Sequence, residues 1–93
     1  MDNTESATGD SLRAQFEQAV AASRQLSERP DNRTLLQLYA LYKQGGEGDA
    51  QGDRPGMTDF VARAKFDAWA ALAGTAPADA QRGYIDLIDS LKA

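Results

Sequence analysis

Two of the three lysines in this 93-residue chain stand among aromatic residues. Lys43 directly follows Tyr42 in the stretch LYALYKQ, and Lys65 precedes Phe66 in the stretch RAKFDAW. An ammonium group is a compact positive charge that suits a phosphate, and a neighbouring ring can stack on a nucleotide base. One such lysine is most simply a solvated position on a helix. Two of them on neighbouring helices favour a site for an anionic ligand that carries a base.

The overall charge argues against nucleic acid as that ligand. Ten basic and fourteen acidic residues give a net charge of −4, whereas binding to a phosphate backbone needs many Lys and Arg contacts. We therefore expect no nucleic acid as a partner. Any anion that this protein binds must be held by a local group of cations, against the sign of the whole molecule.

The residue types that are missing restrict the chemistry further. The chain has no cysteine and no histidine, which excludes thiol nucleophiles, disulfides, iron–sulfur clusters and the usual zinc ligands. It also lacks the side chain that most often acts as a general base near neutral pH, and no acidic cluster has EF-hand spacing. We therefore expect a binding protein without catalytic residues, metal or cofactor, and not an enzyme.

The amino-terminal stretch MDNTESATGD has neither a basic start nor an apolar core, so it does not resemble a signal peptide. No apolar run approaches the roughly 20 residues that cross a bilayer. We therefore expect a cytoplasmic protein with no membrane span. Residues 1–10 are predicted to form a disordered polar tail, and residues 11–93 a single folded domain.

Four helical segments position the candidate side chains, and the sequence indicates no strand. Apolar residues recur at intervals of three and four over residues 11–27, 32–44, 59–73 and 75–91. Asn32 is the expected N-cap of the second segment, and Gly45–Gly46 its expected end. Gly74 is the expected end of the third segment. Pro77 stands in the first turn of the fourth, where its missing N–H costs nothing.

The connection between the second and third segments, GGEGDAQGDRPGM, is longer than is usual in a helical bundle. At roughly 3.3 Å per residue it can span more than a helix of about fifteen residues, which rises about 1.5 Å per residue. It can therefore return the chain along the bundle, so that the second and third helices run parallel. The other junctions are short and favour antiparallel neighbours.

The second segment has more apolar surface than one buried stripe requires. Its two adjacent stripes consist of Leu35, Leu38 and Tyr42, and of Leu36, Tyr39 and Lys43. Either this helix is central and buried on both flanks, or one stripe packs inward while the other lines a groove. In the second case the groove has apolar sides, and its polar end lies near the end of the helix.

Together these stretches resemble the acyl-CoA-binding protein family, also called the diazepam-binding-inhibitor family. The resemblance runs without a gap from about residue 11 to residue 92. The pattern that carries it is Tyr39-x-x-Tyr42-Lys43-Gln44, Gly48-Asp49, Arg54-Pro55-Gly56, Ala64-Lys65 and Ala68-Trp69. The resemblance implies an all-α four-helix bundle with up-down-down-up topology, which agrees with the long second connection.

The resemblance also implies a ligand, a thioester of coenzyme A with a long fatty acid, which family members carry and store inside cells without catalysing a reaction. It implies that Lys43 and Lys65 hold the 3′-phosphate of the ribose, and that Arg24 approaches the phosphates. Arg24 stands where members of the family frequently have lysine, and Phe66 where they commonly have tryptophan. The resemblance therefore does not fix the affinity for the ligand. The rings implied to contact the phosphate, ribose and adenine are Tyr39, Tyr42 and Tyr84.

Such a ligand needs an apolar groove beyond its cations and rings. Each buried methylene contributes roughly 0.8 kcal/mol, so about ten would contribute roughly 8 kcal/mol as an upper limit, before the cost of ordering the chain. Packing in the core explains the candidate groove residues at least as well as contact with a ligand. These candidates are Phe16, Leu35, Leu36 and Leu38.

The residues leave two other functions open. A helical protein-interaction module could keep the fold without the ligand, with a protein partner covering the surface of residues 39–43. Thioester hydrolysis is the enzymatic alternative, but it lacks the usual Cys and His. For a carrier, the expected partners are long-chain acyl-CoA and, transiently, enzymes that use it. We expect a monomer. The sequence determines neither the preferred length of the acyl chain nor whether the ligand induces dimerisation.

Overall fold

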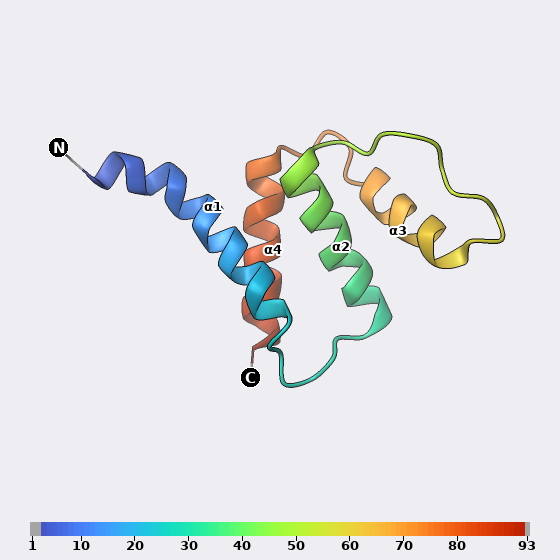
Figure 1. Cartoon of the computed structure of the whole chain (residues 1–93), viewed down its shortest axis with the longest axis horizontal. Helices are drawn as coiled ribbons and strands as arrows, with labels where there is room; N and C mark the ends of the chain where they lie inside the picture. The colour runs from blue at the N-terminus through green and yellow to red at the C-terminus, as the bar shows by residue number, and fades with distance from the viewer. Residues whose placement is uncertain (1–2, 93) are drawn as a thin grey trace.

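The structure, a computed structural model, describes residues 3–92, and their side chains from Leu12 onward. Over these residues it contains four α-helices and no strand, so the expected all-α, four-helix class is confirmed (Figure 1). The helices are α1 (Asn3–Ser23), α2 (Asn32–Glu47), α3 (Phe60–Ala70) and α4 (Pro77–Leu91). Within this described part, none is long and apolar enough to cross a membrane.

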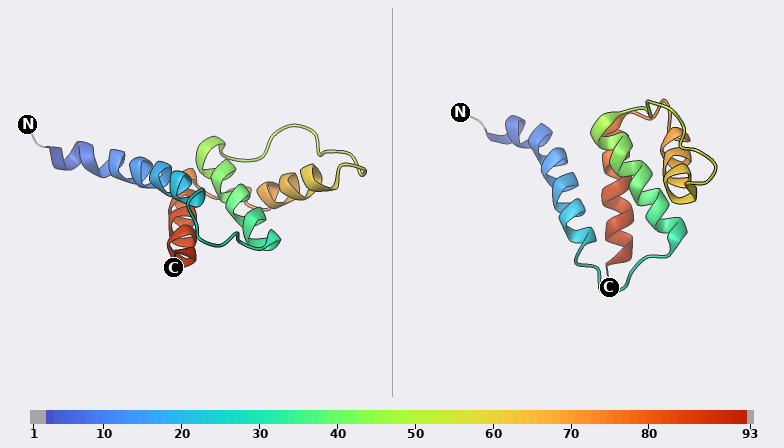
Figure 2. Two further views of the ribbon diagram at one scale, coloured as in Figure 1. Left: turned by 60° about the horizontal axis from the view of Figure 1, so that its bottom comes forward. Right: turned by 45° about the vertical axis from the view of Figure 1, so that its right-hand side comes forward.

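The topology is the one that the long second connection favours. The colours, which run from blue at the N-terminus to red at the C-terminus, show that α2 and α3 run in one direction and α1 and α4 in the opposite direction (Figures 1 and 2). α2 packs against α4 on one flank and against α3 on the other, while α1 packs against α4. The second helix is therefore central, and the expected up-down-down-up arrangement is confirmed.

The first helix differs most from its expected bounds. It begins at Asn3 rather than near residue 11, and it ends at Ser23 rather than at residue 27. Adding a residue to an existing helix costs little compared with nucleating one, and no proline interrupts residues 3–10. The division of the chain into a tail, residues 1–10, and a domain, residues 11–93, stays a prediction; residues 1 and 2 lie outside the described residues.

The prediction that α2 stops at Gly45–Gly46 is wrong, because the helix continues to Glu47. A Cβ atom on Gly45 would lie 3.0 Å from Cγ of Gln81 and 3.2 Å from Cζ of Phe16. Gly45 is therefore a point of close helix packing rather than a stop signal. The backbone turns at Gly48, whose φ of 82° suits glycine.

The other expected boundaries need small corrections. The N-cap of α2 is Asp31 and not Asn32, since its carboxylate accepts a hydrogen bond of 2.8 Å from the backbone N–H of Thr34. α3 ends at Ala70, and turns that include Gly74, at a φ of 89°, lead to α4. Such differences of one to three residues are usual where neighbouring polar residues compete for a cap.

The hydrophobic core lies where α1, α2 and α4 meet. Its buried residues are Phe16, Ala19, Leu38, Tyr84 and Ile88, and half-buried apolar side chains such as Val20, Ile85 and Leu91 pack around them. The first helix therefore packs on the fourth through these side chains. Because α3 contributes nothing to this cluster, other contacts must fix its position.

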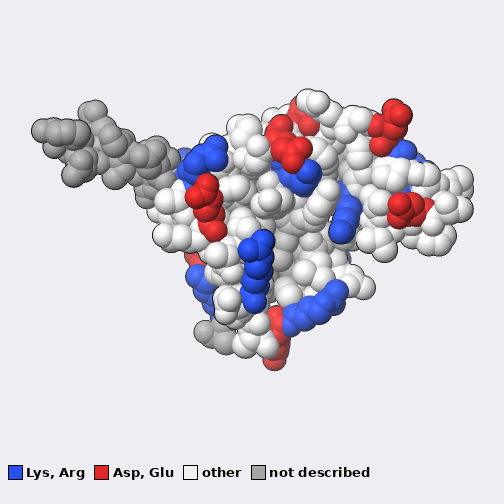
Figure 3. Space-filling view, in the orientation of Figure 1, with Lys and Arg blue, Asp and Glu red and all other residues white. Residues whose placement is uncertain are grey.

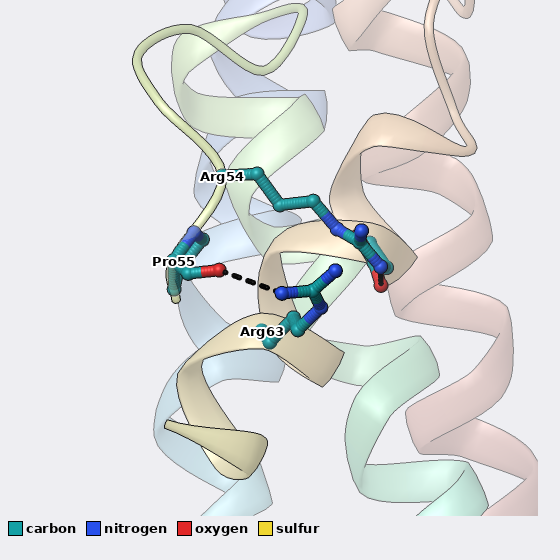
Figure 4. A network of polar contacts seen from close by, with 4 residues as sticks. Arg54, Pro55 and Arg63 are labelled. Carbon is teal, nitrogen blue, oxygen red and sulfur yellow. Dashed lines mark hydrogen bonds and ion pairs between the residues drawn. The ribbon is translucent and has the colours of Figure 1, made fainter. Parts of the chain in front are cut away.

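A network of polar contacts attaches the long connection to α3 (Figure 4). The Arg54 guanidinium donates two hydrogen bonds to the Asp67 carboxylate, at 2.8 and 2.7 Å. Arg63 donates to the carbonyl of Pro55 at 3.3 Å. The hydrogen bonds from Arg54 hold the pKa of Asp67 below its usual value. Bidentate pairs of this kind fix geometry as well as charge, so the connection is tied along the outer side of α3.

A second group of polar contacts, here called the polar clasp, joins the end of α2 to the α3–α4 turn. It consists of Gln44, Asp49, Gly74 and Thr75. The amide nitrogen of the fully buried Gln44 donates to the Asp49 carboxylate and to the Thr75 carbonyl, each at 2.8 Å. Asp49 also accepts from the backbone N–H of Gly74 at 2.9 Å. These hydrogen bonds lower the pKa of Asp49, and the one from Gln44 has the largest effect.

Candidate functional site

A cavity of about 850 Å³ opens between α1, α2 and α3, with Tyr84 of α4 in its wall. Figure 3 shows the hollow on the face formed by these helices, with basic side chains around its edge. Most of the residues expected at the ligand site line this cavity. They are Arg24, Tyr39, Tyr42, Lys65 and Tyr84, together with Leu35, Leu36 and Leu38; Lys43 and Phe16 do not line it.

The charge of the cavity opposes the charge of the molecule. Arg24, Arg29 and Lys65 line it, and none of the described lining residues is Asp or Glu, although the chain carries a net charge of −4. In the described part of the chain, none of these three cations pairs with a carboxylate. Like charges gathered beside low-dielectric walls focus a positive potential. The cavity is therefore suited to an anion.

The rings of Tyr42 and Tyr84 lie at one end of the cavity, and Phe16 packs behind them. Phe16 contacts Tyr84 edge to face, with ring centroids 5.4 Å apart, and contacts Tyr42 at 6.2 Å. The rings of Tyr42 and Tyr84 lie 6.4 Å apart. Tyr42 is 46% exposed, whereas Tyr84 is buried. Phe16 thus supports the two tyrosines from the core, and Tyr42 offers a ring on which a flat group can stack.

Cations and rings alternate along the contact between α2 and α3. The Lys65 ammonium lies 5.4 Å from the centroid of the Tyr39 ring, and the Lys43 ammonium lies 4.9 Å from that of Trp69. On each helix the two partners are four residues apart, and four residues make about one helical turn. Because α2 and α3 run parallel, the two cation–π pairs follow one another along the interface. Lys43 and Lys65 therefore lie on the same side of the molecule.

Lys43 nevertheless differs from the cations that line the cavity. Its ammonium forms an ion pair with Glu47, one turn further along α2. The hydrogen bond with Glu47 raises the pKa of Lys43, and the nearby Tyr39 and Tyr42 add to this effect. In the ligand-free protein, the Lys43 charge is thus already neutralised by its own helix.

Apolar side chains also line the cavity at the starts of α2 and α3, the part here called its apolar end, although Asn32 at the start of α2 lines it too. Leu35 and Leu36 come from the start of α2, and Phe60 and Val61 face them from the start of α3. Phe60 is 77% exposed and Val61 is 67% exposed, which is unusual for large apolar side chains that lie next to one another. A groove with this lining can take an alkyl chain, since each buried methylene is favourable.

Nine of the residues that line the cavity were not predicted from the sequence, among them Arg29, Phe60 and Val61. Arg29 precedes Pro30 in the short junction before α2, and the residue before a proline is restricted to extended conformations. The proline could have indicated that the backbone of Arg29 is restricted in conformation. Phe60 and Val61 open a helix directly after Asp59; their exposure depends on how α3 sits against α2, which no local pattern gives.

The site offers binding groups rather than reactive ones. Among the described side chains, from Leu12 to Lys92, no three Asp, Glu, His or Cys groups lie together as a metal-binding group would require. The cavity itself presents guanidinium and ammonium groups, tyrosine rings and alkyl side chains. Such groups can hold an anion, a flat ring and a chain of methylenes at the same time.

Comparison with known proteins gives relatives over most of the chain. Residues 13–88 match the family model described as "Acyl CoA binding protein". The "Acyl-CoA-binding protein homolog" of Manduca sexta is 48% identical over 82 residues, which are 87% of this chain and 91% of the relative. The crystal structure of Oryza sativa Acyl-CoA-Binding Protein 2 is similar, with a TM-score of 0.86 at 32% identity; the match covers 90% of this chain and 91% of that one.

A further relative is a much longer protein. "Enoyl-CoA delta isomerase 2" of Rattus norvegicus is 45% identical over 76 residues. These residues are 82% of this chain but only 19% of the isomerase. The similarity therefore concerns one small part of that protein.

Proposed function

The chain belongs to the acyl-CoA-binding protein family, and we propose that it binds long-chain fatty acyl-CoA thioesters. In this proposal it acts as an intracellular carrier that forms a pool of the ligand and catalyses no reaction. The observation that carries the proposal is the cavity itself. On an acidic protein, its described residues combine three cations without a carboxylate partner, no Asp or Glu in the lining, exposed tyrosine surface and an apolar end.

The head group of the ligand is assigned to the charged and aromatic end of the cavity. Coenzyme A carries a 3′-phosphate, a diphosphate and an adenine ring. Arg24, Lys43 and Lys65 bind the phosphates in this proposal, because charge-assisted hydrogen bonds to phosphate are the strong ones. The rings assigned to the adenine, the ribose and the phosphate are Tyr39, Tyr42 and Tyr84.

The fatty acyl chain is assigned to the apolar end. Leu35 and Leu36 on one side and Phe60 and Val61 on the other leave room for a chain between them. Burying about ten methylenes contributes at most roughly 8 kcal/mol, less the cost of ordering the flexible chain. The head group then determines which ligand is bound, and the tail determines how tightly.

The finer points of the proposal rest on different grounds. A monomeric state, a cytoplasmic location and transient contacts with acyl-CoA-using enzymes rest on the family alone. The absence of a reaction is supported by the chemistry of the cavity, which contains no nucleophile beside a general base.

Calorimetric titration tests the proposal directly. Acyl-CoA thioesters of increasing chain length are expected to bind with rising affinity, whereas coenzyme A alone and the free fatty acid bind far more weakly. Incubation with the ligand should release no free thiol. If no acyl-CoA of any length gives heat, the carrier function is wrong and a protein-interaction module becomes the better reading of the exposed cavity.

A further inference from the structure

We propose that Glu47 is a specificity-determining residue, an internal carboxylate that competes with the ligand phosphate for Lys43. In the free protein Glu47 holds the Lys43 ammonium, and a ligand that brings a phosphate to this end of the site must displace it. The inference rests on the proposed function. It concerns how strongly this chain distinguishes a 3′-phosphorylated head group from one that lacks that phosphate.

The geometry of the ion pair supports this competition. Lys43 and Glu47 are four residues apart on α2, and their side chains are in contact. The Lys43 side chain is 21% exposed, since it also lies over the Trp69 ring, while that of Glu47 is 55% exposed. The carboxylate can therefore leave towards water, whereas the ammonium stays beside the rings of the site.

The contrast with the neighbouring cation makes Glu47 distinctive. Lys65 also lies over an aromatic ring, that of Tyr39, but it lines the cavity and has no carboxylate partner among the described residues. The Lys65 ammonium beside Tyr39 is thus free to bind an anion, whereas the Lys43 ammonium beside Trp69 is already paired with Glu47. Without Glu47, the Lys43 ammonium would also have no carboxylate partner among the described residues.

A phosphate can displace Glu47 from Lys43 because it carries the larger negative charge. A phosphate monoester carries about −1.5 to −2 charges at pH 7 and several acceptor oxygens, whereas Glu47 carries one. Exposed pairs at this helical spacing are weak, so a phosphate can replace the carboxylate. The displaced Glu47 still lies near the bound phosphate and repels it. Both effects lower affinity for a phosphorylated head group, and neither acts on a head group without it.

The test compares two ligands on Glu47→Gln. The probes are an acyl-CoA and the acyl-dephospho-CoA of the same chain length, measured by calorimetry at low salt. The variant is expected to bind the acyl-CoA about two- to fivefold more tightly and the dephospho ligand with unchanged affinity. Raising the salt concentration should reduce the gain, because exposed charges are screened.

Two further variants control for charge and for the route of the effect. Asp79→Asn removes the same charge from the Asp79–Arg82 pair of α4, away from the cavity, and should change neither affinity. In a Lys43→Gln background, Glu47→Gln should bring at most the small gain from lost repulsion. An equal gain for both ligands, a full gain without Lys43, or weaker acyl-CoA binding would overturn the inference. Failure of the carrier function is recognisable separately, because the unchanged protein would then bind neither ligand, and the inference falls with it.

Discussion

The two ends of the α2–α3 interface differ in whether their charged groups are paired. At the end that faces the cavity, Lys65 lies over Tyr39 without a carboxylate, close to a surface that also carries Arg24 and Arg29. At the other end, Lys43 is paired with Glu47, and the indole N–H of Trp69 donates to the carbonyl of Gly48 at 2.8 Å. The polar clasp continues this paired region into the α3–α4 turn.

This difference separates an end where Lys65 is free for a ligand from an end where Lys43 is already paired and Trp69 helps to hold the fold. Cations gathered without counter-charges repel one another, and the folded protein would be more stable if a carboxylate stood among them. A site that must attract an anion cannot contain such a carboxylate. The paired end has no such restriction, so its hydrogen bonds and buried ring can serve α3, which contributes nothing to the main core.

The largest expected effect is on stability, from the paired end. Trp69→Ala removes a buried ring and the hydrogen bond to Gly48, and should lower the free energy of unfolding by about 3–5 kcal/mol. Phe60→Ala is the matched variant on the same helix. Because Phe60 is 77% exposed, its removal should change stability by no more than about 0.5 kcal/mol. Urea unfolding measures both, and similar losses would mean that the two ends do not differ.

The next effect is on binding, from the cavity end. Lys65→Met removes an unpaired cation and should weaken acyl-CoA binding about 10- to 100-fold, as expected for a charge-assisted contact. The free energy of unfolding should stay the same or rise slightly, because repulsion from Arg24 and Arg29 decreases. Lys92→Met, which removes a lysine paired with Asp89 on the surface of α4, is the control. Equal affinities in the two variants would contradict the cavity as the head-group site.

The smallest effect concerns pH and again distinguishes the two regions. The folded-state pKa values of Asp49 and Asp67 are lowered by their hydrogen bonds, whereas an unfolded Asp titrates near about 3.9. Their contribution to stability is therefore fully present above about pH 4 and is lost as the pH falls through the folded-state values. Unfolding measured from pH 7 down to about pH 2.5 should show this loss.

A variant of the polar clasp sharpens the pH experiment. Asp49→Asn has no charge to titrate at this position, so its stability should fall less steeply with acid than that of the unchanged protein. The cavity contributes nothing to this transition because no carboxylate lines it. An equally steep loss in Asp49→Asn would remove the polar clasp as a source of acid sensitivity.

Local pattern was a good guide wherever short-range effects decide the structure. The four helices and the parallel course of α2 and α3 follow from apolar spacing and from the length of one connection. The boundary at Gly45–Gly46 was mispredicted, because the approach of Gln81 and Phe16 from other helices requires glycine inside the helix. The start of α1 was mispredicted because a polar stretch can prolong a helix that is stabilised elsewhere.

The candidate site was predictable to a different degree for each residue. Tyr39, Tyr42 and Lys65 line the cavity and were expected at the site, because rings beside lysines, together with a family resemblance, indicated them. Arg29, Phe60 and Val61 were not, since each lies at the edge of an element, where its direction depends on how two helices pack. The pairing of Lys43 with Glu47 was also unexpected, although their spacing of four on a helix is visible in the sequence.

By itself, the sequence determined the helical class, the absence of Cys and His chemistry, and the side chains from which an anion site could be built. These are properties of residue types and of short-range spacing. Only the tertiary structure decided that Arg24, Arg29 and Lys65 line one cavity with no carboxylate among its described residues. The physical reason is that charges act through space, so their effect depends on which helices meet and not on their order along the chain.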